Sequence, residues 1–186
     1  MGIKLLGTTF TVALLVASAD RVGFAARVTN NGQEPDVECS STRTGMDTIE
    51  TSRRFMTGFV EFINTASPTM AKELVTPAAI FHVPGRPEPV KGPEGYLEVI
   101  GMMRGGFPDI QWTIDEMVVE PTKVAARFTM RGTHRGPFFG VAPTGKRIMV
   151  QALNIYHLCH GQIVKEYGQP DMMALLQQIG GLPTAK

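Results

Sequence analysis

The sequence predicts a single α+β domain in which most helices precede an antiparallel sheet. Apolar residues recur at helical spacing as far as Met103, and from Ile110 onward the apolar period changes to two. Helices followed by a strand meander are typical of the α+β class. A length of 186 residues allows one sizeable core but not two ordinary ones.

The first helix is predicted to begin at Asp47, which with Glu50 three residues later makes an Asp version of the capping box. A second, shorter helix is opened by Ser67 and Pro68 and extends through Leu74. The apolar residues that share one face of the first helix are Phe55, Phe59, Phe62 and Ile63, and we assign them to the core.

The next predicted elements are a strand over 78–83 and a helix that begins at Pro93, a favourable residue at the first helical position. Gly105 and Gly106 are expected to stop this helix. Its apolar face is formed by Tyr96, Ile100 and Met103.

Four strand-like runs follow, the last two joined by a tight turn at His160 and Gly161. Asp171 then precedes a short helix over 172–179, which Gly180 ends. The four runs are 110–114, 123–134, 147–158 and 162–169.

His134 ends the second of these runs, on the same side as the apolar residues that alternate from Val124 to Met130. Two interpretations stand for this side chain. An imidazole titrates close enough to neutrality to polarise a substrate oxygen or steer a carboxylate. Alternatively, His134 is a strand-end histidine bonded to a loop carbonyl.

Short motifs stand in order along the folded part: 92–96 (GPEGY), 107–109 (FPD), 132–136 (GTHRG), 143–147 (PTGKR), 155–156 (IY), 161–166 (GQIVKE), Asp171 and 175–180 (LLQQIG). In order and spacing this set resembles the SnoaL-like polyketide cyclases of the nuclear transport factor 2 superfamily, over about residues 49–182. The resemblance implies a cone-shaped barrel, a curved mixed or antiparallel sheet wrapped around N-terminal helices. It also implies a central pocket and a homodimer packed through the sheet.

By the same resemblance, Asp171 matches the aspartate that acts as general acid/base in an intramolecular aldol ring closure, without metal or organic cofactor. A carboxyl group can perform both proton transfers if an apolar pocket raises its pKa. Helix N-capping is the alternative role for Asp171, because Asp is favoured at that place. His134 is the assisting catalytic candidate.

The resemblance therefore implies a cyclase or isomerase acting on a small, oxygenated, hydrophobic, polyketide-like substrate. The alternative is a non-catalytic carrier that binds an apolar ligand in the same pocket, because a fold alone does not fix chemistry. Candidate substrate-binding residues are His82, Trp112, Asn154, Tyr156 and Tyr167, although cross-strand packing is a common role for tyrosine.

The N-terminus has the composition of a cleaved signal peptide over 1–19. Lys4 precedes an apolar run over 5–16, and Ala17 and Ala19 supply small residues for cleavage before Asp20. The run is shorter than the about 20 residues that a membrane span needs, so we expect a secreted protein without a permanent anchor. A buried N-terminal strand or helix is the alternative. A polar lead over 20–45 is expected before the pocket domain at 46–183.

Charge, cysteine content and histidine spacing bear on three further questions: a nucleic-acid partner, a disulfide and a metal site. A net charge of +1 gives no electrostatic reason to expect a nucleic-acid partner. Cys39 and Cys159 either pair after export or remain separate thiols. A metal site is not predicted, because His157, Cys159 and His160 alternate and then turn instead of converging.

Overall fold

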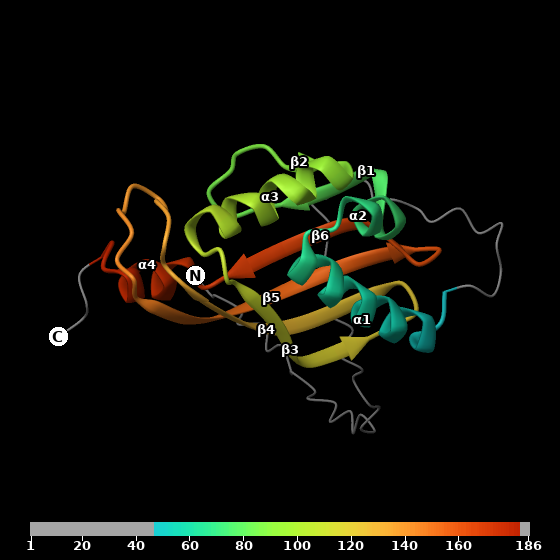
Figure 1. Ribbon diagram of the computed structural model, residues 1–186. Coiled ribbons are helices and arrows are strands. Elements are labelled where there is room, and N and C mark those ends of the chain that lie inside the picture. The colour runs from blue at the N-terminus through green and yellow to red at the C-terminus, as the bar shows by residue number, and fades with distance from the viewer. Residues whose placement is uncertain (1–46, 183–186) are drawn as a thin grey trace, which may run out of the picture. The chain divides into compact units, whose positions relative to one another are not determined.

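The computed structural model describes residues 47–182, so the predicted leader, the polar lead and Cys39 lie outside the described residues. Within the described range, six strands form one mixed sheet in the order β2-β1-β6-β5-β4-β3 (Figure 1). The strands are β1 Val75–His82, β2 Val90–Lys91, β3 Gln111–Val119, β4 Lys123–Thr133, β5 Arg147–Cys159 and β6 Gln162–Pro170. The helices are α1 Ile49–Thr65, α2 Pro68–Leu74, α3 Gly92–Gly106 and α4 Met172–Ile179.

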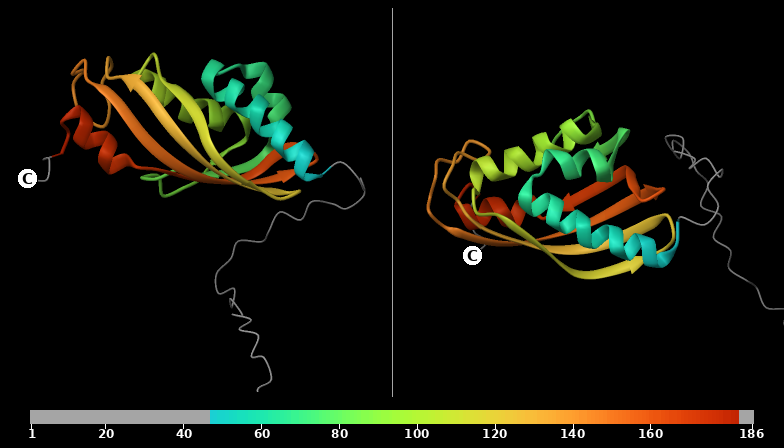
Figure 2. Two further views of the ribbon diagram at one scale, coloured as in Figure 1. Left: turned by 90° about the horizontal axis from the view of Figure 1, so that it is seen from below. Right: turned by 45° about the vertical axis from the view of Figure 1, so that its right-hand side comes forward.

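The predicted α+β class is confirmed, with a curved sheet that holds α1, α2 and α3 on one side and does not close into a barrel (Figures 1 and 2). All neighbouring strands pair antiparallel except β1 and β6, which run parallel. This pairing places the last strand of the chain between the first strand and the β3–β5 meander.

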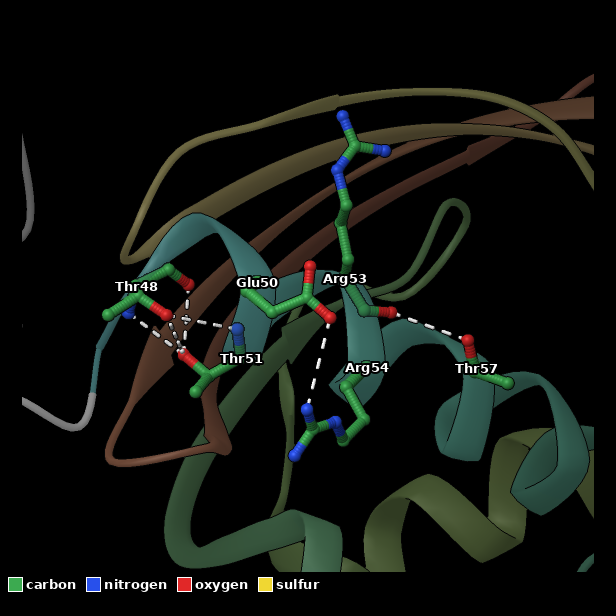
Figure 3. A network of polar contacts seen from close by, with 6 residues as sticks. All are labelled: Thr48, Glu50, Thr51, Arg53, Arg54 and Thr57. Atoms are coloured by element: carbon green, nitrogen blue, oxygen red, sulfur yellow. Dashed lines mark hydrogen bonds and ion pairs between the residues drawn. The ribbon is translucent and has the colours of Figure 1, made fainter.

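The N-cap of helix α1 lies one residue after its predicted position. The Thr51 N–H donates to Thr48 Oγ1 (3.1 Å) and the Thr48 N–H donates to Thr51 Oγ1 (2.8 Å), a reciprocal capping box (Figure 3). Thr48 therefore caps the helix in place of Asp47. The Asp47 carboxylate instead lies 3.6 Å from Nδ1 of His160 in the β5–β6 turn.

The predicted starts of α2 and α4 and the hairpin turn are confirmed, whereas α3 begins at Gly92, one residue before the predicted Pro93. Ser67 caps α2 through Met70, and Asp171 caps α4 by accepting from the Ala174 N–H at 2.9 Å. His160 and Gly161 both have positive φ, at 50° and 75°, as a two-residue hairpin turn requires.

The core lies between the helices and the inner face of the sheet. Phe59 and Phe62 of α1 are fully buried and pack against Tyr96 of α3 at ring distances of 5.7 and 5.6 Å. Phe59 also contacts Tyr156 of β5 edge-on at 5.0 Å. No helix within residues 47–182 is both long and apolar enough to cross a membrane.

The β4–β5 loop is tied to the end of α3 by main-chain contacts. The N–H groups of Arg135 and Gly136 both donate to the carbonyl of Gly106, at 2.9 and 3.0 Å. A Cβ atom at position 136 would lie 1.8 Å from the carbonyl oxygen of Gly105, so only glycine fits there.

Candidate active site

A cavity of about 110 Å³ lies between the helices and the inner face of the sheet. It has room for a small organic molecule, since one water needs only about 10–15 Å³ by the same kind of measure. Its walls are mostly apolar, with a few polar groups on α3, β5 and β6, a composition typical of sites for small molecules.

The apolar part of the cavity is built largely from adaptable side chains. Met102 and Met103 come from α3, Trp112 from β3 and Met172 from the start of α4. Phe139 of the β4–β5 loop also lines the cavity, although 56% of its surface is exposed. Methionine and aromatic side chains fit irregular apolar ligands, because they are large and polarisable.

The polar groups meet in one cluster formed by Tyr96, Asn154, Tyr156 and Glu166, all of which line the cavity. Tyr156 of β5 and Glu166 of β6 are directly opposed in the antiparallel pair. Asn154 lies two residue pairs along, on the same face of the sheet, so its amide meets both side chains. Its Nδ2 donates to Glu166 Oε1 at 2.8 Å and to the Tyr156 hydroxyl at 3.0 Å.

Glu166 is the only carboxyl group among the described residues that line the cavity, and it is 5% exposed. Burial raises the pKa of Glu166 from 4.5 to about 8, since the charged form loses its hydration. Hydrogen bonding to Tyr96, Asn154 and Tyr156 lowers this pKa but does not offset the burial. Glu166 is therefore mostly protonated at neutral pH.

The two tyrosines keep their protons beside this carboxyl group. Burial and then the Glu166 charge raise the pKa of both Tyr96 and Tyr156 well above the usual value. Each hydroxyl is consequently available as a hydrogen-bond donor to a carboxylate or to a substrate oxygen. A titratable carboxyl group held among neutral donors in an apolar cavity is suited to proton transfer.

Comparison with known proteins assigns this chain to a family. The family model described as SnoaL-like polyketide cyclase matches residues 53–179. The chain belongs to this family. IdmH from Streptomyces antibioticus has a similar solved structure, with 32% identity and a TM-score of 0.63, covering 69% of this chain and 97% of IdmH.

Two further Streptomyces proteins are similar to this SnoaL-like chain. TsrD from Streptomyces laurentii has 26% identity and a TM-score of 0.64, over 72% of this chain and 97% of TsrD. Aklanonic acid methyl ester cyclase AcmA from Streptomyces galilaeus is 26% identical over 93 residues. That match spans 49% of this chain and 64% of AcmA, slightly under two thirds of the relative.

Asp171, the residue that the resemblance assigns to catalysis, lies at the edge of the cavity. Its neighbours Pro170 and Met172 line the cavity, but Asp171 itself does not and is exposed. One carboxylate oxygen accepts the Ala174 N–H as the cap of α4. The capping role is thus present in the structure, and the proton-transfer role stays a prediction.

His134 is fully buried away from the cavity lining. Its Nδ1 lies 3.0 Å from Thr144 Oγ1, and its ring packs against Phe107 at 5.3 Å. The main chain of His134 is bonded at both N–H and carbonyl to the far end of the β4–β5 loop. In this position His134 holds the loop through a hydroxyl, close to the predicted alternative of a bond to a loop carbonyl.

The predicted substrate-binding residues divide into two groups. His82, Trp112, Asn154 and Tyr156 line the cavity, whereas Tyr167 does not. The Tyr167 ring stacks on that of His82 at 4.6 Å and lies 5.0 Å from Lys165 Nζ. No cluster of three or more possible metal ligands occurs among the described residues.

Sequence reasoning missed Glu166, and a β-bulge explains why. Counting back from the His160–Gly161 turn pairs Glu166 with Ile155, whose side chain is exposed. The observed register shifts by one residue between the 157 and 158 pairs, so Glu166 opposes buried Tyr156 instead. Because a one-residue slip reverses every side chain, the shift turns Glu166 from the outer face to the cavity.

Proposed function

We propose that this protein is a cofactor-independent cyclase or isomerase that acts on a small, oxygenated, mostly apolar substrate of the polyketide type. Family membership and the similarity to AcmA, an aklanonic acid methyl ester cyclase, support the reaction class. The observation that carries the proposal is the buried carboxyl group of Glu166, the one carboxyl group that residues 47–182 contribute to the apolar cavity, with a pKa of about 8 that lies close to working pH.

In the proposed reaction Glu166 transfers one proton twice. Its ionised form removes a proton from a carbon next to a substrate carbonyl, and the resulting enolate carbon forms a bond to a second carbonyl carbon. The protonated Glu166 then returns the proton to the oxygen of that second carbonyl, so the net proton count is unchanged. Tyr96 and Tyr156 are placed to donate hydrogen bonds to oxygens that gain negative charge.

Turnover of the parent protein and of two carboxyl variants tests this assignment, with aklanonic acid methyl ester as the first substrate of a polyketide ester panel. We expect Glu166→Gln to lower turnover by about 10² or more, because the amide cannot transfer the proton. Glu88→Gln makes the same chemical change at an exposed position and should be neutral. The parent rate should rise with pH towards about 8 and then level off, as the ionised form accumulates.

Asp171→Asn is the decisive comparison, because Asn keeps the helix cap and removes proton transfer. If Asp171→Asn abolishes turnover while Glu166→Gln retains it, the acid/base group is Asp171, as the sequence resemblance implies. If the parent binds an apolar ligand but turns over no substrate in the panel, the carrier alternative is favoured. Quenching of Trp112, the single tryptophan of the chain and a cavity residue, reports binding.

We also propose that the protein forms a homodimer through the outer face of its sheet. Three large apolar residues of β5, Met149, Leu153 and Ile155, are 62%, 54% and 44% exposed on the face opposite buried Val150. Several exposed large apolar side chains on one face of a sheet are typical of an interaction surface. Light scattering should give about twice the chain mass, and Leu153→Lys should halve it. A monomeric parent at all concentrations would contradict the proposal.

Export remains a further proposal, since the predicted leader lies outside the described residues. Intact-mass analysis of protein from its native host should show a chain that begins at or near Asp20. Recovery of the full chain inside the cell would remove both the export proposal and the reason to expect pairing of Cys39 with Cys159.

A further inference from the structure

Both N–H donors of Asn154 are used within the protein, so neither is left for a ligand. Its Nδ2 donates to Glu166 Oε1 at 2.8 Å and to the Tyr156 hydroxyl at 3.0 Å, while its Oδ1 accepts the Gln169 N–H at 3.3 Å. An amide offers two N–H donors, and both are used here. The sequence assigned Asn154 to substrate binding, but its contacts lie within the protein.

The direction of this amide is fixed by the main chain. The N–H of Gln169 can only donate, so the oxygen of Asn154 faces the main chain at Gln169 and the NH₂ group faces the Glu166 side chain. Gly168 is the residue opposite Asn154, and a Cβ there would lie 3.4 Å from Glu166 Oε1 and 3.8 Å from both amide atoms of Asn154. Position 168 therefore lies in van der Waals range of the place where the two side chains meet.

The two carboxyl oxygens of Glu166 are consequently unequal. Oε1 accepts the Asn154 N–H, whereas Oε2 is buried and has no hydrogen-bond partner among the described residues. An oxygen that accepts an N–H keeps its carbonyl character when the group is protonated, so the proton resides on the other oxygen. A buried polar atom without a partner calls for an explanation, and a bound ligand is one that this cavity allows.

We propose that Asn154 is a positioning residue, which holds Glu166 Oε1 and leaves Oε2 as the oxygen that takes the substrate proton and returns it. This inference rests on the proposed function of Glu166. The titratable groups that face Glu166 are Tyr96 from α3 and Tyr156 from β5. Both stay protonated and add no charge, and their hydroxyl groups act with the Asn154 amide as donors to Glu166.

The test titrates Glu166 directly in the full chain without substrate. Infrared difference spectra across pH contain the carbonyl stretch of protonated Glu166, identified as the band that Glu166→Gln removes. Asn154→Leu keeps the side-chain size and deletes the donor. Since a hydrogen bond to a charged group contributes about 1.5–3 kcal/mol, the midpoint of the band should rise by about one pH unit or more. Gln151→Leu, on the exposed side of the same strand, is the matched control and should leave the midpoint unchanged.

Kinetics then separate positioning from substrate binding. A positioning role predicts that Asn154→Leu lowers kcat about tenfold and moves the pH–rate profile upward with the infrared midpoint, while KM changes little. A raised KM with an unmoved midpoint would mean that Asn154 binds substrate, and would overturn the inference. If Leu disturbs the fold, as thermal unfolding would reveal, Asn154→Ala removes the same donor.

Failure of the proposed function has a different signature. If Glu166→Gln retains full turnover, Glu166 is not the acid/base group, whatever the infrared midpoint does. The contact with Asn154 would then be structural only. An unmoved midpoint in both Asn154 variants would instead refute the positioning role even where Glu166 is essential for turnover.

Discussion

Replacing Glu166 by Gln should remove a strong pH dependence from the stability of the fold. The pKa of Glu166 rises from 4.5 to about 8 on folding, chiefly through burial. Between these values the unfolded chain releases a proton that the folded chain retains, so the free energy of unfolding falls as pH rises. At about 1.4 kcal/mol per pH unit, the full loss is about 5 kcal/mol, a large part of the stability of an ordinary domain.

Urea unfolding at pH 5 and pH 9, followed by circular dichroism, measures this effect without any substrate. The parent protein should lose about 4 kcal/mol more than Glu166→Gln between the two pH values, because most of the titration lies between them. Glu88→Gln, at an exposed position, should follow the parent at both. Parallel losses in the parent and Glu166→Gln would refute a raised pKa for Glu166, and with it the basis of the proposed chemistry.

Three further substitutions probe the supports around the cavity. Gly136→Ala should destabilise the protein by about 3 kcal/mol or more, because its Cβ would lie 1.8 Å from the Gly105 carbonyl oxygen. A thermal midpoint within about 1–2 °C of the parent would contradict the close contact. His134→Ala should cost about 2–4 kcal/mol in urea unfolding, through a lost bond to Thr144 and an internal void, and should lower turnover less than Glu166→Gln does. An equal loss of turnover in a stable His134→Ala protein would support the catalytic prediction for this histidine. Thr48→Ala should cost about 1 kcal/mol by removing the cap of α1, and unchanged unfolding would show that Thr51 alone suffices.

Local patterns in the sequence predicted most of the fold because each depends on nearby residues. The N-caps at Ser67 and Asp171, the positive-φ turn at His160 and the alternation of β5 all follow from spacing within a few positions. The capping box at α1 was misplaced by one residue, because two hydroxyl residues compete with Asp47 for the same role.

The site was harder to predict than the fold, because it depends on register between strands. No residue pattern in 161–166 predicts the register shift that turns Glu166 inward. From the sequence alone, Glu166 is expected to be a solvent-exposed charge on a strand. Burial of a carboxyl group is also a tertiary property, created jointly by α1, α3 and β5. His134 shows the converse: alternation predicted correctly that it faces inward, but could not distinguish the cavity from the closed core beside Phe107.

The strand order has a consequence for how the protein folds. Strand β6 follows both β1 and the β3–β5 meander in the sequence, yet it joins them in the sheet. Until residue 170 is available, the early helices with β1 and the meander share no strand pairing, and the cavity has no carboxyl group. Pairing within the meander needs no later segment, whereas completion of the sheet needs contacts between residues far apart in sequence, which form slowly.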